Sequence, residues 1–354
     1  MSINLGIIGA GEISRIHLDA IKSIPEITVV AICDVDESIA AKRAEQFGIT
    51  KYYTDDHDIL NDKDIDAVAI VTPTFTHYKL TMAALEAGKH VFCEKPPALT
   101  CQEAADMESK AKEAGKLLMY GLVCRFKEEI KFIKEFIAAG RVGDIHCVEV
   151  SRIHRCHPIG GWFRLKDKAG GGCMMDAAIH QLDLAMYFLG YPKAKTVRAF
   201  ATDVNKDLPD IMKDAGTEYV SVNNSHIERT VESFMNGYIT FCTGQVMYIK
   251  ASHISNTPEP TTKIEIMGEK SGIIYDNLNE KIDILTPDRE LNYYIKSQPV
   301  LENNVNSYAE ELRHFAECIN TGKECISNSR EGTELMRILN ALYESADTGK
   351  EIIL

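Results

Sequence analysis

The chain has 354 residues, of which 45% are hydrophobic, and it exceeds the roughly 250–300 residues at which a single core stops growing, so two domains are expected. Its formal net charge of -13 and its pI near 5.4 exclude a general nucleic-acid or anionic-membrane binder, because such proteins need a basic surface.

Strands and helices alternate up to about residue 120. Near-continuous Val/Ile runs mark the strands, and glycines such as Gly48 mark helix ends. This strict alternation predicts right-handed crossovers and a parallel sheet covered on both faces. The expected strands are 4–9, 27–34, 66–73, 90–96 and 116–121, and the expected helices are 14–24, 37–48, 76–88 and 100–115.

The alternation of strands and helices ends after residue 122. A helix at 128–140 leads into a run of strands, interrupted by one helix at 174–190, and the chain ends in two further helices. We therefore predict an α/β N-terminal dinucleotide-binding domain over residues 1–122. An α+β domain over residues 123–354 is predicted to follow, with a large, mostly antiparallel open sheet. The expected strands of this domain are 145–154, 196–204, 229–244, 245–252, 262–269, 271–277 and 281–287, and its last helices are 306–323 and 331–350.

Ten cysteines are spread along the chain without a CxxC pair, which is typical of buried thiols in a reducing compartment and not of a disulfide framework or a zinc site. The one crowded donor cluster is His154, Cys156 and His157, and with no second ligand set beside it we expect no bound metal. The N-terminus lacks a basic signal region, and no segment reaches the ~18 apolar residues of a membrane span. A cytoplasmic location is expected.

The first motif is GIIGAGEIS, an apolar run followed by two glycines and a helix start. Gly9 permits a tight turn and Gly11 lets the backbone approach a pyrophosphate. The N–H groups at the helix start, Glu12 and Ile13, face that anion. Ser14 replaces the third glycine of the common motif, and its small size still allows close packing of helix on sheet.

Asp34 ends the second predicted strand, 23 residues after Gly11. A carboxylate at this place accepts hydrogen bonds from the adenosine ribose hydroxyls. The alternative is that Asp34 only caps the following helix. Because no arginine follows it to receive a 2'-phosphate, NAD is favoured over NADP as the cofactor.

Four segments in order resemble the glucose-fructose oxidoreductase/inositol dehydrogenase (Gfo/Idh/MocA) family. They are GIIGAGEISRIH, IVTPTFTHYKLTMAALEAGKHVFCEKPPALT, GGGCMMDAAIHQLDLAMYFLG and SYAEELRHFAECINTGK. The resemblance implies a Rossmann domain, an α+β domain whose open sheet commonly makes oligomer contacts, and an active site between them. It also implies that Thr72, Pro73 and His77 line the cofactor cleft, and that Glu94 and Lys95 lie near the nicotinamide. The Lys95–Pro96 peptide is often cis in this family.

Asp176 and His180 are four residues apart in a predicted helix, so the carboxylate can orient or polarise the imidazole. The imidazole is suited to removing a hydroxyl proton, and the Lys95 ammonium to stabilising the developing alkoxide. Taken singly, Lys95 is equally consistent with a solvated lysine at a strand end. Asp176 and His180, taken singly, are equally consistent with a hydrogen bond on the face of a helix. Substrate contacts are expected from the loop RIHRCHPIGGWFR and the segment VCRF, and the candidates are Arg125, His157, Trp162 and Arg164.

These residues predict an NAD-dependent dehydrogenase acting on a secondary hydroxyl of a sugar, cyclitol, sugar nucleotide or glycoside, with C3 of a pyranoside as one target by family analogy. Two alternatives stay open. One is an NAD-dependent glycoside-cleaving enzyme with transient oxidation and no net redox change, and the other is a non-catalytic NAD-binding regulator. A homo-oligomer formed through the C-terminal sheet is expected, without nucleic-acid or membrane partners.

Overall fold

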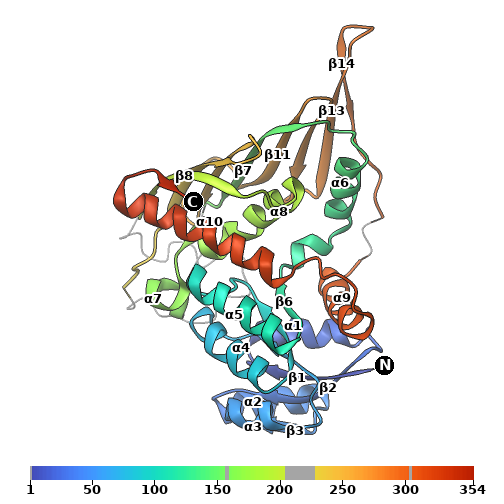
Figure 1. Ribbon diagram of the computed structural model, residues 1–354, viewed down its shortest axis with the longest axis vertical. Coiled ribbons are helices and arrows are strands. Elements are labelled where there is room, and N and C mark those ends of the chain that lie inside the picture. Colours follow the sequence, from blue (N-terminus) through green and yellow to red (C-terminus); the bar gives the residue numbers. More distant parts are fainter. Residues whose placement is uncertain (1, 156–158, 204–227, 303–304) are drawn as a thin grey trace. The chain divides into compact units, whose positions relative to one another are not determined.

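The computed structural model describes residues 2–155, 159–203, 228–302 and 305–354, which form two compact units (Figure 1). Unit 1 consists of Met1–Phe126 and Val305–Met336, and unit 2 of Lys127–Asn304 and Arg337–Leu354. The last part of the chain is therefore divided between the units, whereas the sequence assigned all of it to the second domain. The boundary after residue 122 stays a prediction for the folding domains.

Unit 1 contains a six-stranded sheet in the order β3-β2-β1-β4-β5-β6, and every neighbouring pair in it is parallel. This is the strand order of a dinucleotide-binding Rossmann sheet. The central strands are apolar throughout, and all four residues of β4 are buried. The strands are β1 (Ile3–Ile8), β2 (Ile27–Cys33), β3 (Lys51–Tyr53), β4 (Ala67–Ile70), β5 (His90–Glu94) and β6 (Leu118–Gly121).

The helices of unit 1 begin and end at residues suited to these positions. Asp36 caps α2 through the N–H groups of its first turn, and Thr100 forms a capping box with Glu103 at the start of α5. Gly48 and Gly115 end these two helices in the left-handed conformation. The helices are α1 (Glu12–Ile21), α2 (Glu37–Phe47), α3 (Asp56–Asn61), α4 (His77–Glu86), α5 (Cys101–Ala114) and α9 (Ser307–Thr321), with 3-10 turns at η1 (Thr74–Thr76) and η2 (Val123–Phe126).

Helix α9 completes the core of unit 1. Leu312, Phe315 and Ala316 are fully buried in one cluster with side chains of β1 and β2. Phe315 also packs edge-on against Phe92 of β5, with 5.9 Å between the ring centroids. The parallel sheet therefore depends for its burial on a helix that lies about 200 residues further along the chain.

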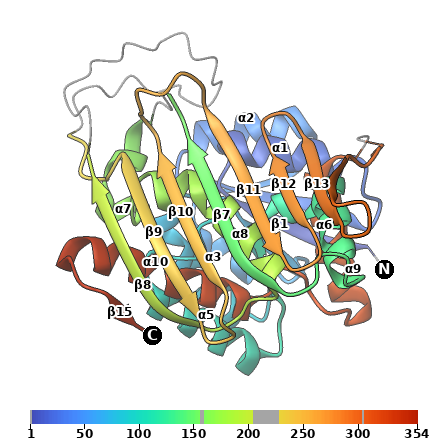
Figure 2. The same cartoon turned by 90° about the horizontal axis from the view of Figure 1, so that it is seen from above.

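Unit 2 contains a nine-stranded sheet in the order β14-β13-β12-β11-β7-β10-β9-β8-β15 (Figure 2). Its pairs are antiparallel except for β10 with β7, which is parallel. Burial alternates along β11, as expected for strands with one covered face. The strands are β7 (Ile145–Ile153), β8 (Ala194–Thr202), β9 (Phe234–Phe241), β10 (Val246–Ser252), β11 (Thr261–Gly268), β12 (Gly272–Asp276), β13 (Lys281–Asp288), β14 (Tyr293–Ser297) and β15 (Ile352–Ile353).

Helix α8 packs against β7 and β11 and covers one face of this sheet (Figure 2). It directly follows a π-helical turn, and the two replace the single helix predicted over 174–190. The helical segments of unit 2 are α6 (Glu128–Ala138), η3 (Gly161–Arg164), α7 (Lys166–Ala169), the π-turn η4 (Met174–Ala178) and α8 (Ile179–Leu189); helix α10 (Ser329–Thr348) begins in unit 1 and ends in unit 2.

The predicted fold class is confirmed: a parallel Rossmann sheet precedes a large, mostly antiparallel sheet with helices. Several short elements were missed, among them β3, α3, α7, β14 and β15. The strand predicted over 229–244 is confined to β9. In the part of the chain that the structure describes, no helix combines the length and apolar character needed to cross a bilayer.

Candidate active site

The glycine turn after β1 has the backbone that the motif predicts. Gly9 has φ +103°, and a Cβ there would come within 2.6 Å of the Val71 carbonyl oxygen. Gly11 precedes α1, and a Cβ on it would meet no described atom within 4 Å. A ligand can therefore approach the backbone at Gly11, where a helix N-terminus favours an anion.

Asp34 lies beside this turn. Its Oδ2 accepts a hydrogen bond from the Ala10 backbone N–H at 2.8 Å, and its Oδ1 accepts one from the Asp36 N–H at 3.0 Å. The residue that caps α2 is Asp36, so Asp34 is not the helix cap considered as an alternative. Since a carboxylate oxygen can accept more than one hydrogen bond, Asp34 keeps the capacity to bind ribose hydroxyls.

Arg43 of α2 holds the glycine turn by hydrogen bonds to its backbone, and the sequence did not reveal this contact. Its Nε donates to the Ala10 carbonyl oxygen and its Nη2 to the Gly11 carbonyl oxygen, both at 3.1 Å. Nη2 also contacts Glu12, and Nη1 donates to Gln46. The guanidinium is thus directed at the protein, and the residues present at this turn fit a nicotinamide dinucleotide.

The triplet after β5 is held by buried side chains. Glu94 Oε1 contacts His17 Nε2 at 2.7 Å, and Oε2 accepts the Lys95 backbone N–H at 3.0 Å. Burial raises the pKa of Glu94, but the hydrogen bond and charge of His17 outweigh this, and the pKa is lowered overall. The Lys95–Pro96 peptide is cis, as the family resemblance implies. Glu94 thereby fixes the backbone of Lys95.

His77 joins two turns of unit 1 and is fully buried. Its Nδ1 lies 2.8 Å from the Pro96 carbonyl oxygen and its Nε2 lies 2.9 Å from the Thr72 carbonyl oxygen. Burial lowers the pKa of His77, and the two carbonyl acceptors oppose this lowering. His77 ties the segment of Thr72 and Pro73 to the turn that carries Lys95.

In unit 2, Asp176 lies in the π-turn and His180 in the first turn of α8. Both side chains are half-buried. His253, which the sequence did not suggest, is buried and places its Nε2 3.4 Å from Asp176 Oδ2. Asp183 is also buried and accepts a hydrogen bond from the Tyr191 hydroxyl. π-turns are rare in proteins, and those that occur are often found at functional sites. This turn therefore marks the Asp176 segment as a site candidate.

Glu232 holds the start of this segment. Its Oε2 accepts the Gly172 N–H at 2.8 Å, and its Oε1 accepts the Met174 N–H at 3.2 Å and the Tyr343 hydroxyl at 2.9 Å. Gly172 is required here, since a Cβ on it would lie 1.9 Å from the Glu232 carbonyl oxygen. Gly172 thus allows the close approach to Glu232.

The predicted substrate contacts have different surroundings. Trp162 stacks on Phe163 with 3.8 Å between ring centroids, and Arg164 Nε is buried without a hydrogen-bond partner among the described residues. Arg125 is buried and donates to the Ile326 carbonyl oxygen and to Glu331, so we leave it out of the proposed substrate contacts. His157 lies outside the described residues.

Burial of the cysteines agrees with the prediction in the part of the chain that the structure describes, and the reducing compartment stays a prediction. The nine cysteines among them are free thiols, and most are buried. Cys156 and His157 of the cluster singled out in the sequence lie outside the described residues, so the absence of a metal there stays a prediction.

The chain belongs to the Gfo/Idh/MocA oxidoreductase family. Residues 3–122 match its NAD-binding Rossmann domain, and residues 134–354 match its C-terminal alpha/beta domain. The protein is thus an oxidoreductase with a nicotinamide dinucleotide-binding domain.

Among its relatives, it is 30% identical to D-glucoside 3-dehydrogenase of Escherichia coli (strain K12), over 99% of this chain and 97% of the relative. It is 27% identical to myo-inositol 2-dehydrogenase of Thermotoga maritima, over 99% and 98%. Levoglucosan dehydrogenase in complex with NADH has the same fold, with a TM-score of 0.86 and 22% identity over 100% of this chain and 99% of that one.

Proposed function

We propose that the protein is an NAD-dependent dehydrogenase that oxidises a secondary hydroxyl of a sugar, cyclitol or glycoside, with C3 of a pyranoside as the first candidate position. Full-length similarity to a D-glucoside 3-dehydrogenase and to an inositol dehydrogenase supports this substrate class. The Asp34 carboxylate, fixed against the glycine turn by the Ala10 N–H, is the observation that carries the cofactor assignment. A negative charge there disfavours the 2'-phosphate of NADP.

Bound NAD supplies the hydride acceptor. In this proposal His180 removes the proton of the substrate hydroxyl, for which the imidazole must start neutral. The ammonium group of Lys95 stabilises the negative charge that develops on the same oxygen. Asp176 orients the imidazole, and His253 in turn contacts the Asp176 carboxylate. Glu94 and His17 hold the backbone from which the Lys95 side chain extends.

The first test is a panel of free sugars, inositols and alkyl glycosides with NAD, followed by absorbance at the NADH band and by mass spectrometry of the products. Accumulation of NADH with a product two hydrogens lighter supports the proposal. Cleavage of a glycosidic bond without NADH accumulation contradicts net oxidation and identifies the NAD-dependent glycoside-cleaving alternative. Tight NAD binding without turnover of any compound identifies the regulator.

Two substitutions then test the residue roles. His180→Ala should lose about 10²- to 10⁴-fold in turnover while NAD still binds, and exposed His146→Ala serves as its control. Wild-type oxidation should rise with pH through the ionisation of His180. Lys95→Ala should reduce turnover far more than NAD affinity, with the largely exposed Lys79→Ala as its control. A folded His180→Ala protein with near-normal oxidation at every pH would exclude His180 as the base.

We also propose a homo-oligomer formed through the sheet of unit 2. Phe200 of β8 and Tyr248 of β10 are about half exposed, at 59% and 48%, and Tyr238 packs against Tyr248 on the same sheet. Such an exposed aromatic patch on a sheet face is typical of a protein interface. Light scattering after size exclusion tests this, and Phe200→Glu with Tyr248→Glu should convert the oligomer to monomer.

A further inference from the structure

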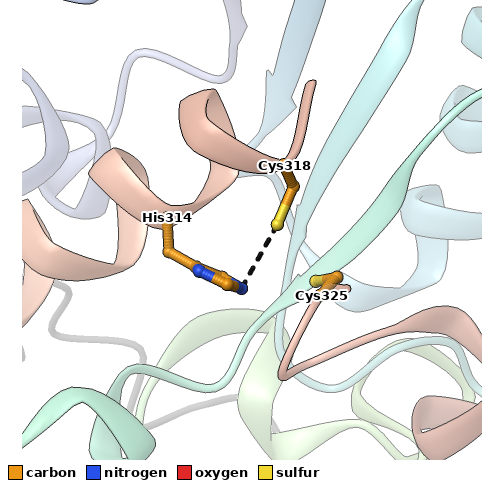
Figure 3. A group of neighbouring side chains, drawn as sticks. All are labelled: His314, Cys318 and Cys325. Carbon is orange, nitrogen blue, oxygen red and sulfur yellow. Dashed lines mark hydrogen bonds between the residues drawn. The ribbon is translucent and has the colours of Figure 1, made fainter. Parts of the chain in front are cut away.

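A second group of reactive side chains lies in unit 1, apart from every residue assigned above. His314 and Cys318 are four residues apart on α9, so they project from the same side of the helix, and Cys325 follows the helix end at Gly322 (Figure 3). All three are buried, with 8%, 6% and 6% exposure respectively. Their donor atoms lie within 4.8 Å of one another, and His314 Nε2 is 3.3 Å from Cys318 Sγ.

The hydrogen bonds around the cluster fix the tautomer of the His314 ring. The Ile326 backbone N–H donates to His314 Nε2 at 3.1 Å, so Nε2 is the unprotonated nitrogen of the ring. The ring N–H is then at Nδ1, which lies 3.9 Å from the Glu317 carboxylate. At 3.9 Å this is an electrostatic contact and not a hydrogen bond, and it places a carboxylate on the side of the ring where metal-binding histidines have their supporting acceptor.

From this geometry we infer that His314, Cys318 and Cys325 form a binding site for a thiophilic divalent cation, with Zn²⁺ as the expected ion. Imidazole nitrogen and thiolate sulfur are its preferred ligands. With Zn–N near 2.1 Å and Zn–S near 2.3 Å, a tetrahedral ion holds N and S about 3.6 Å apart, close to the 3.3 Å separation in the cluster. A water molecule or another small ligand completes the four positions.

Charge favours this ion at a buried place. Zn²⁺ replaces the two thiol protons, which leave to solvent, and the resulting two thiolates and neutral imidazole give a site without net charge. Because Zn²⁺ takes the lone pair of Nε2, the Ile326 N–H must turn to another acceptor, for which a neighbouring thiolate is suited.

The site has a structural consequence in unit 1. The segment after Cys325 pairs with the last strand of the parallel sheet, through the Tyr120 N–H to the Ser327 carbonyl oxygen at 3.0 Å and a bridge between Met119 and Asn328. A metal at the cluster ties this segment to the end of α9. We therefore expect the ion to stabilise unit 1 without touching substrate or NAD.

The first experiment uses the reduced full chain, stripped with EDTA and titrated with Co²⁺ as a spectroscopic probe for Zn²⁺. We expect one equivalent to give a thiolate-to-cobalt charge-transfer band and the intense visible bands of a four-coordinate ion, both abolished by Zn²⁺. Zn²⁺ alone should raise the melting temperature, and EDTA should reverse the rise. A six-coordinate, oxygen-ligand spectrum would overturn the inference.

Substitutions assign the ligands. Cys318→Ser and Cys325→Ser should each weaken Co²⁺ binding by more than about 10- to 100-fold, the loss produced by removing only a supporting group. Exposed Cys242→Ser is the matched control and should bind as the wild type does. If the variants do not fold, X-ray absorption spectroscopy of the wild-type Zn²⁺ complex identifies the ligands. Two sulfur atoms bound to the ion would support the site. Equal binding by Cys325→Ser, or a Cys318–Cys325 disulfide whose reduction gives no metal uptake, would refute it.

Discussion

Glu232→Gln tests whether a buried carboxylate positions the Asp176 segment. The substitution keeps the shape of the side chain but exchanges one acceptor oxygen for an NH₂ donor. Oε2 accepts from the Gly172 N–H, whereas Oε1 accepts from the Met174 N–H and the Tyr343 hydroxyl. In either orientation of the amide, at least one backbone N–H then faces a donor.

The magnitude follows from these contacts. A hydrogen bond to a charged group contributes about 1.5–3 kcal/mol, so the loss of one bond should lower the free energy of unfolding by about that amount. This corresponds to about a 10- to 150-fold change in the unfolding equilibrium. Met174 begins the π-turn that contains Asp176, so turnover should fall as well. NAD affinity should not change, because the residues proposed to bind the dinucleotide belong to unit 1.

Urea unfolding followed by circular dichroism gives the stability change, and steady-state kinetics give kcat separately from KM. Tyr343→Phe removes one donor and leaves both backbone bonds to the carboxylate, so its effect should be smaller. Exposed Glu135→Gln of α6 controls for the loss of a charge. If Glu232→Gln has wild-type stability and kcat, or if its losses equal those of Glu135→Gln, Glu232 does not position this segment.

Three further changes have defined outcomes. Asp34→Ala should weaken NAD binding and narrow the preference for NAD over NADP in calorimetric titrations; tighter NADP binding by the wild type would contradict the assignment. Burial lowers the pKa of His90 to about 4, so the unfolded state binds more protons between about pH 6.5 and 4. The free energy of unfolding should therefore fall, by up to about 3 kcal/mol, as the pH drops through this window, and His90→Gln should remove this slope in urea unfolding. Gly172→Ala should destabilise the protein by several kcal/mol in the same assay, because the new Cβ would overlap the Glu232 carbonyl oxygen. Its control, Gly272→Ala, should be tolerated, because a Cβ there would lie 3.4 Å from the Ile266 carbonyl oxygen. Equal effects of the two substitutions would argue against the close contact at Gly172.

Local chemistry made much of the first unit predictable. Gly9 and Asp34 lie at strand ends whose sequence spacing is set by one strand-helix-strand unit, so their meeting at the turn follows from a few residues. The positions of Asp176 and His180 on one helical segment were also expected. The π-turn that contains Asp176 was not expected, because its extra residue per turn leaves no mark in the apolar pattern.

The supporting residues could not be predicted because their partners are distant in sequence. His17 and Glu94 are 77 residues apart, and Gly172 and Glu232 are 60 apart. Nothing in the local sequence of Glu232 distinguishes it from a surface glutamate in a strand. Strand β14 was missed for a different reason: all five of its residues are exposed, so no alternation of apolar and polar side chains marks it.

The packing of α9 on the parallel sheet limits where the gene can be divided for recombination. A fragment ending at residue 122 would lack Leu312 and Phe315, and the apolar faces of β1 and β2 that they cover would be open to water. Such a fragment should aggregate, although it contains every motif assigned to the dinucleotide. To exchange cofactor preference between relatives by recombination, two segments must therefore be exchanged together: the N-terminal segment and residues 305–336.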